Sequence, residues 1–269
     1  MKIGVTLRNM GPQSSRETLA ACATAIDDTP IESIWITDHI AIPPDDAEGS
    51  GGRYLDTLST LAWLGGLTER VKLASGVLIL PYRPILPIAK QVATIAELTN
   101  DRLIFGIGVG WMAPEFKALG VDRRQRGKLT DDYLSALTEA FSNDVIEHNG
   151  QPFIFAPRPP MPELLIGGAA PIATARALRH NAGWLPMARA PEQIAEEAKR
   201  FSQDGGRSIT VMSGISQTDS GQTDSSEAAA QIDAWRELGI DRLVCALRYD
   251  TTDQALEQVT RIAELAPRP

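Results

Sequence analysis

Cysteine is nearly absent from this chain, since Cys22 and Cys245 are the only two among 269 residues. They lie far apart and lack the spacing of metal ligands, so neither a disulfide framework nor a zinc site is expected. Long apolar runs are also missing, and the short stretch from Met1 to Leu7 cannot form the core of a signal peptide. We therefore expect a cytoplasmic protein that is not secreted and does not span a membrane.

Positive charge is in deficit. The chain has 26 Lys and Arg residues against 34 Asp and Glu residues, which gives a formal net charge of -8. This balance argues against nucleic acid or an anionic membrane as the main partner. Hydrophobic residues make up 43% and aromatic residues 6%, as in an ordinary soluble globular enzyme. The expected partner is a small-molecule substrate.

Several catalytic motifs are missing as well. The sequence contains no P-loop, no serine nucleophile elbow and no cluster of histidines and carboxylates for a metal ion. The dinucleotide fingerprint G-x-G-x-x-G begins at Gly106 and Gly108 but fails at Trp111, where the third glycine should stand. Hydrolase, kinase, metalloenzyme and Rossmann dehydrogenase functions therefore have little support, and no metal is expected.

Short apolar runs alternate with helix-like segments along the whole chain, which is typical of repeated βα units around a parallel sheet. We predict eight strands, at residues 2–7, 32–38, 71–79, 102–109, 162–166, 183–187, 208–213 and 242–247. Eight units can lie open as a doubly wound sheet or close into a barrel, and the count favours closure. The predicted fold is α/β, a single (β/α)8 TIM barrel over residues 1–269.

Helices are predicted between these strands, and Ser14 or Ser15 can cap the first of them. An excursion from the barrel, a β-hairpin, is expected over 145–155, because alternating residues flank the turn pair Asn149-Gly150. The glycine-rich stretch 42–53 suits either a lid or a surface loop, and the polar stretch 216–225 is a reduced insertion that cannot pack. The other predicted helices span 54–67, 84–98, 123–141, 171–179, 191–201, 226–238 and 252–265.

Gly106, Gly108 and Gly110 follow one another at every second position of a predicted strand. Strand side chains alternate between two faces, so one face is bare while Phe105, Ile107 and Val109 fill the other. Glycine inside a strand is costly, and a run of three indicates that a ring, a phosphate or another backbone approaches closely. The alternative explanation for the three glycines is a crowded barrel interior that has room only for small residues.

Other candidate residues stand at predicted strand ends, where barrel enzymes place their sites. Asp38-His39 ends the second strand, and an imidazole can donate or accept a proton near neutral pH. Gly76 interrupts the third strand and suggests a bulge. The turn Gly167-Gly168-Ala169 precedes a helix start, where free N–H groups can hold a phosphate. His148 and His180 have ordinary surface or capping positions.

Taken together, these stretches resemble the bacterial luciferase-like monooxygenase family, and particularly its branch that depends on the deazaflavin coenzyme F420. The resemblance covers nearly the whole chain and implies a TIM barrel, which agrees with the eight units counted from the pattern alone. The residues that carry it are 35–39, 71–77, 83–84, 101–111, 115–116, 119–120, 126–127, 131–133, 162–168 and 182–184.

The resemblance also implies where a cofactor would lie. The flavin-like ring would rest against a bulge at Ser75, Gly76 and Val77, which in relatives contains a non-proline cis peptide. Asp38 and His39 match the pair that contacts the ring, and Gly167, Gly168 and Ala169 match the phosphate turn. We further hypothesise that His39 is the catalytic residue, which donates a proton or polarises the acceptor. The glycine strand, with Gly106, Gly108, Val109 and Gly110, would pass beneath the ring and its chain. Relatives often dimerise, so a homodimer is expected.

This chain departs from the family pattern at three places. Sugar-phosphate dehydrogenases of the family have an acid and a tryptophan where Trp111 and Ile42 stand here, so that substrate class is disfavoured. Met112 replaces an asparagine that contacts the cofactor chain in many relatives. The expected function is hydride transfer between F420 and a small organic substrate. An FMN-dependent monooxygenase and a non-catalytic flavin-binding barrel are the alternatives.

Overall fold

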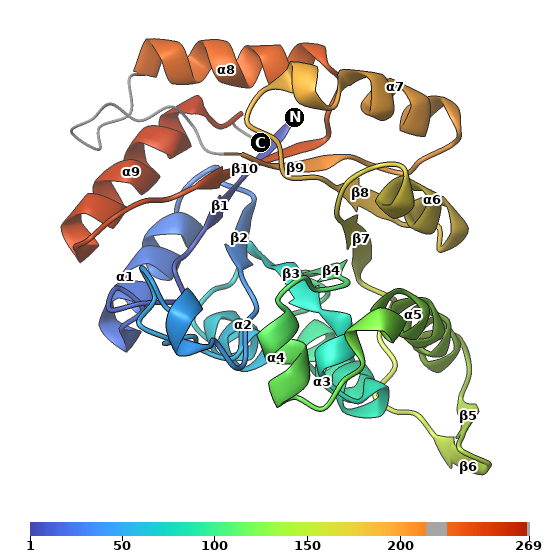
Figure 1. Cartoon of the computed structure of the whole chain (residues 1–269). Coiled ribbons are helices and arrows are strands. Elements are labelled where there is room, and N and C mark those ends of the chain that lie inside the picture. Colours follow the sequence, from blue (N-terminus) through green and yellow to red (C-terminus); the bar gives the residue numbers. More distant parts are fainter. Residues whose placement is uncertain (214–224, 268–269) are drawn as a thin grey trace.

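Eight parallel strands form one sheet in the computed structural model, in the order β8-β7-β4-β3-β2-β1-β10-β9 (Figure 1). Two parallel bridges, Trp184 with Ile209 and Met187 with Met212, join the two ends of this sheet. The sheet is therefore a closed barrel, as the sequence predicted. The structure describes residues 1–213 and 225–267. The strands are β1 (Lys2–Thr6), β2 (Ser33–Ile36), β3 (Lys72–Ile79), β4 (Leu103–Gly108), β7 (Glu163–Gly167), β8 (Gly183–Leu185), β9 (Thr210–Ser213) and β10 (Arg242–Ala246).

Helices lie outside this barrel, at least one after each of its strands (Figure 1). Each of the eight predicted strands is confirmed, and Ser15 caps the first helix by accepting a hydrogen bond from the Thr18 N–H. The short helix α4 (Ala113–Ala118) after β4 was not predicted. The others are α1 (Arg16–Asp27), α2 (Thr57–Gly65), α3 (Ile85–Leu98), α5 (Arg126–Ser142), α6 (Ile172–Arg179), α7 (Ala195–Gln203), α8 (Ser225–Glu237) and α9 (Thr252–Leu265).

The predicted hairpin is confirmed as β5 (Val145–His148) and β6 (Gln151–Ile154), which project from the barrel after α5 (Figure 1). Asn149 and Gly150 both have positive φ, at 51° and 76°, as a two-residue turn between right-twisted strands requires. In the stretch 42–53, a 3-10 turn covers Pro44–Asp46, and the Arg53 Nε donates to the Ser14 hydroxyl at 2.9 Å. Residues 216–224 of the predicted insertion lie outside the described residues.

Two apolar cores sit on the two faces of the barrel sheet. The larger one fills the space between strands and helices and includes Phe105 and Ile107 of β4. The smaller one fills the barrel itself, with Trp35 packed against Ile104 and Leu185. The alternation of β4 follows from this arrangement, because Ile104, Gly106 and Gly108 share the inward face.

Arg242, the first residue of β10, closes the amino-terminal end of the barrel and is 1% exposed. Its guanidinium forms ion pairs with Glu32 at 2.8 Å and with Glu163 at 3.0 Å, and lies 6.0 Å from the Trp35 ring. Burial by itself would lower the pKa of Arg242, but hydrogen bonds and charges from Glu32 and Glu163 raise it instead. The arginine therefore stays charged in the barrel.

We expect Arg242→Met to lower the free energy of unfolding by about 3 kcal/mol, because it removes the cation that Glu163 pairs with and leaves Glu32 only its longer ion pairs with Lys2 and Lys72. Urea unfolding followed by circular dichroism measures the change. The control is Arg261→Met, which removes a surface pair within α9 and should cost less than about 0.5 kcal/mol. Equal losses in the two variants would contradict a special role for Arg242.

Candidate functional site

A cavity of about 840 Å³ opens at the carboxyl ends of β3, β4, β7 and β8. Its lining is mostly apolar, and among the described residues that line it Glu197 is the one with a charged side chain. The volume suits a small ligand or a cofactor ring. The lining residues are Gly76, Val77, Gly108, Val109, Gly110, Trp111, Gly167, Gly168, Ala169, Ala170, Trp184, Leu185, Pro186, Met187, Gln193, Ile194, Glu197 and Met212.

The three strand glycines have different surroundings. A methyl group at Gly106 would lie 2.2 Å from the Ser75 carbonyl oxygen, so this position admits another backbone and does not line the cavity. A methyl group at Gly108 would lie 2.6 Å from Val77 Cγ2, and Gly110 adopts a φ of +78°. Gly108, Val109 and Gly110 line the cavity. The crowded interior thus accounts for Gly106, and the cavity face begins at Gly108.

The third strand has the bulge that was expected. Its pairing with β4 shifts register between Ser75 and Leu78, and the Gly76–Val77 peptide bond is cis. Ser75 is buried, and its hydroxyl donates to the Gly106 carbonyl oxygen at 2.8 Å. Gly76 and Val77 line the cavity, whereas Ser75 lies beneath them. Ser75 is therefore placed to hold the bulge, and Gly76 and Val77 are placed to meet a ligand.

The turn Gly167-Gly168-Ala169 forms another wall of the cavity and leads into α6. Gly168 has a φ of +128°, and its carbonyl oxygen accepts a hydrogen bond from Trp184 Nε1 at 2.8 Å. Within the described part of the chain, the N–H groups of Ala169 and Ala170 donate to no other group. These two donors are free to bind an anionic or polar group of a ligand.

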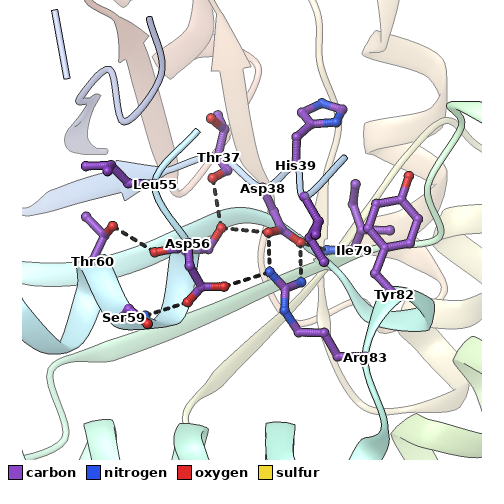
Figure 2. A network of polar contacts seen from close by, with 12 residues as sticks. Thr37, Asp38, His39, Leu55, Asp56, Ser59, Thr60, Ile79, Tyr82 and Arg83 are labelled. Atoms are coloured by element: carbon purple, nitrogen blue, oxygen red, sulfur yellow. Dashed lines mark hydrogen bonds and ion pairs between the residues drawn. The ribbon is translucent and has the colours of Figure 1, made fainter. Parts of the chain in front are cut away.

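Asp38 and His39 are neighbours in sequence whose side chains point in different directions (Figure 2). The Asp38 carboxylate accepts two hydrogen bonds from Arg83, each at 2.8 Å, and one from the Ile79 N–H at 2.9 Å. Thr57 adds a fourth hydrogen bond. Asp38 is buried and does not line the cavity, so it fastens the end of β2 to β3 and α2 rather than facing a ring directly.

His39 points away from this network (Figure 2) and contacts a carboxylate, that of Glu115, which the sequence did not single out as functional. Its Nδ1 lies 2.8 Å from Oε2 of Glu115 in α4, and the Glu115 side chain is 0% exposed. The His39 ring packs edge-on against Tyr54, with centroids 5.0 Å apart, and against Trp111 at 6.3 Å. Trp111 lines the cavity and His39 does not, so the imidazole lies behind the Trp111 ring at the edge of that space.

Glu115 and Tyr82 are the residues that sequence reasoning missed. The Tyr82 hydroxyl donates to Glu115 Oε2 at 2.9 Å, and the N–H groups of Ile40 and Ala41 donate to Oε1. A signal existed, because Glu115 is an acidic residue beside Phe116 in a segment just after the glycine strand. Its partners lie more than thirty residues away, however, and sequence spacing does not reveal such contacts.

Glu115 makes the stability of the protein depend on pH. Burial alone would raise its pKa, but hydrogen bonds from His39, Ala41, Ile40 and Tyr82 lower it from 4.5 to about 2. A carboxyl with a lower pKa in the folded state stabilises the fold above its unfolded pKa, and this contribution disappears as the pH falls towards the folded value.

We therefore expect the wild-type protein to lose about 3 kcal/mol of unfolding free energy from this residue between about pH 4.5 and 2. Denaturant unfolding of the wild type and of Glu115→Gln across this range isolates the contribution. The two free energies should converge as the pH falls. A difference that stays constant with pH would contradict the assignment.

Within residues 1–213 and 225–267, no helix has both the length and the apolar composition needed to cross a bilayer. In the same described residues, no three His, Cys, Asp or Glu side chains are grouped so that they could hold a metal ion.

A closed (β/α)8 barrel with an apolar cavity at the carboxyl ends of its strands defines a class of proteins that bind their ligands at that face. The model of one family in this class, the luciferase-like monooxygenases, matches residues 1–264. The chain therefore belongs to the luciferase-like monooxygenase family.

Three similar proteins illustrate the range of this resemblance. An uncharacterized protein of Mycobacterium tuberculosis is 28% identical over 207 residues, which cover 69% of this chain and 71% of the relative. The oxygenating constituent of 3,6-diketocamphane monooxygenase from Pseudomonas putida, solved with FMN, has a TM-score of 0.79 at 14% identity and covers 99% of this chain and 98% of its own. An F420-dependent secondary alcohol dehydrogenase, solved with an F420-acetone adduct, has a TM-score of 0.78 at 13% identity, covering 97% of both chains. At these identities the two structures show a shared fold, and the cofactor stays open between FMN and F420.

Proposed function

We propose that this protein is an oxidoreductase that transfers a hydride between coenzyme F420 and a small organic alcohol or carbonyl compound. The observation that carries the proposal is the edge-on contact, at 6.3 Å between ring centroids, of His39, a side chain that can exchange a proton, with Trp111, which lines the mostly apolar cavity. When bound, the deazaflavin supplies the hydride chemistry. Reduction of a carbonyl also needs a proton at oxygen, and we assign this proton exchange to His39.

The cavity fits a planar, phosphate-bearing cofactor. Val77, Leu185 and Met212 offer apolar surface for a ring, and the turn at Gly168 offers the free N–H groups of Ala169 and Ala170 to a phosphate. A side chain at Gly76, Gly108 or Gly110 would come within 2.6 to 2.8 Å of a protein atom, so the wall of the cavity is backbone at these positions and can support the ring.

The charge of the phosphate group itself, taken without the carboxylates of the F420 tail, favours F420 over FMN. Among the described residues that line the cavity there is no lysine or arginine, and Glu197 is present. A phosphate monoester, as in FMN, carries about -1.5 to -2 charges at neutral pH. The phosphate of F420 is a diester with a single charge, so moving it from water into a cavity without a facing cation costs less free energy.

The test is titration of the purified apoprotein with F420 and with FMN, followed by fluorescence. We expect F420 to bind at least about tenfold more tightly, which corresponds to about 1.4 kcal/mol. Glu197→Gln should reduce the difference between the two affinities, because it should improve FMN binding more than F420 binding. Tighter binding of FMN by the unmodified protein would favour the monooxygenase function, in which the same cavity excludes water from a reactive flavin.

A further inference from the structure

We propose that Glu115 is a positioning residue for His39: it keeps the proton of the neutral imidazole on Nδ1, so that Nε2 is the nitrogen that exchanges a proton with the substrate. The proposal deepens the proposed function and rests on it for the identity of the reaction. Its structural content, the tautomer of His39, can be measured without cofactor or substrate.

The hydrogen bonds around Glu115 determine which partner donates. The N–H groups of Ile40 and Ala41 have no lone pair to offer, so both must donate to Oε1. Oε2 faces the Tyr82 hydroxyl at 2.9 Å and His39 Nδ1 at 2.8 Å. With no proton on the carboxylate, Nδ1 has to be the donor.

Electrostatics supports a charged Glu115. Its pKa of about 2 leaves it ionised throughout the neutral range. Burial raises the pKa of Tyr82, and the hydrogen bond to Glu115 and its charge raise it further, so the phenol keeps its proton and donates it. No second carboxylate forms an ion pair with His39 among the described residues, so Glu115 alone sets the proton on Nδ1.

A fixed Nδ1–H tautomer has a direct chemical consequence. Nε2 then carries the lone pair and can accept the proton of a substrate hydroxyl, so that the O–H bond breaks as the Nε2–H bond forms. The positive charge of the resulting imidazolium lies against the Glu115 carboxylate. The reverse step returns the proton to oxygen. A carboxylate behind a catalytic histidine acts in the same way in other enzymes.

Glu115→Gln tests the proposal because it should reverse the tautomer. The backbone donors of Ile40 and Ala41 still need an acceptor, so the new amide oxygen should take the place of Oε1. Its NH₂ group then faces His39 Nδ1 and donates to it. The neutral ring must carry its proton on Nε2, where it can no longer accept one.

The measurement is the ¹⁵N NMR spectrum of the histidine rings above neutral pH. The chain has three histidines, so His39→Gln identifies the signals of His39. We expect Nδ1–H in the wild type and Nε2–H in Glu115→Gln, with kcat lowered about 10²-fold and KM changed less than about threefold. Asp131→Asn is the matched control, because it neutralises a carboxylate beside a different histidine, His180, at 3.6 Å and away from the cavity. It should keep the Nδ1–H tautomer of His39 and a kcat within about threefold of the wild type.

Two results would overturn the proposal: an Nε2–H tautomer in the wild type, or an unchanged tautomer in folded Glu115→Gln. The wild-type spectrum decides even if that variant does not fold. A wild type that shows Nδ1–H but neither binds F420 nor turns over alcohols with it would instead refute the proposed function and leave the tautomer assignment standing.

Discussion

His39→Ala is expected to lower kcat by about 10²- to 10⁴-fold, the usual contribution of a general acid or base. The Kd for F420 should change less than about threefold, because the apolar walls and the turn at Gly168 remain in place. The large expected loss of kcat follows from the small number of ionisable groups near His39. Glu115 is buried behind His39, and Asp38 is occupied by Arg83, so no other described neighbour can readily take over the proton.

His148→Ala is the matched control, since His148 lies in the hairpin that projects from the barrel. It should leave both kcat and the Kd unchanged. Stopped-flow measurement of F420 reduction by a panel of small alcohols provides the rates, and fluorescence titration provides the affinities. Turnover by His39→Ala at the wild-type rate would remove His39 from the mechanism. Cofactor binding without turnover by the wild type on any alcohol or carbonyl compound would favour the non-catalytic barrel.

The barrel was predictable because its determinants are local. Each strand is a short apolar run, and each helix has its own periodicity or cap, such as Ser15 before α1 and Asn149-Gly150 in the hairpin. The closure of the sheet into a barrel was predicted only from the number of βα units. The bridge between Trp184 and Ile209 confirms it. Helix α4 escaped prediction because six residues are too few to show a helical period.

The site was less predictable because it depends on contacts between distant segments. The sequence placed His39 at a strand end but could not show that a carboxylate 76 positions later lies 2.8 Å from its ring. The same limit applies to Asp38, which the resemblance paired with His39. Both residues lie beyond the end of β2, where the Asp38 carboxylate pairs with Arg83 and the His39 ring turns towards Glu115.

Gly106→Ala is expected to destabilise the protein by about 4 kcal/mol or more and to abolish cofactor binding. The added methyl group would lie 2.2 Å from the Ser75 carbonyl oxygen and 3.1 Å from Leu185 Cδ2. The φ of Gly106 is not positive, so the cost is steric and not conformational. Relief requires movement of the backbone at Ser75, and that backbone leads directly into Gly76 and Val77 at the cavity.

Gly127→Ala provides the comparison, because it adds the same methyl group in the first turn of α5. The nearest atom there, Arg176 Nη2, would be 3.7 Å away, which is ordinary contact. Alanine favours a helix over glycine, so this variant should gain up to about 1 kcal/mol. Urea unfolding of both variants measures the change in unfolding free energy. Titration of the folded fraction of each variant with F420 measures the change in cofactor affinity. If the free energy of unfolding of Gly106→Ala lies within about 1 kcal/mol of the wild-type value, the bulge can move away from β4. Contact with a ligand, and not with the Ser75 carbonyl, would then explain why glycine is needed at this position.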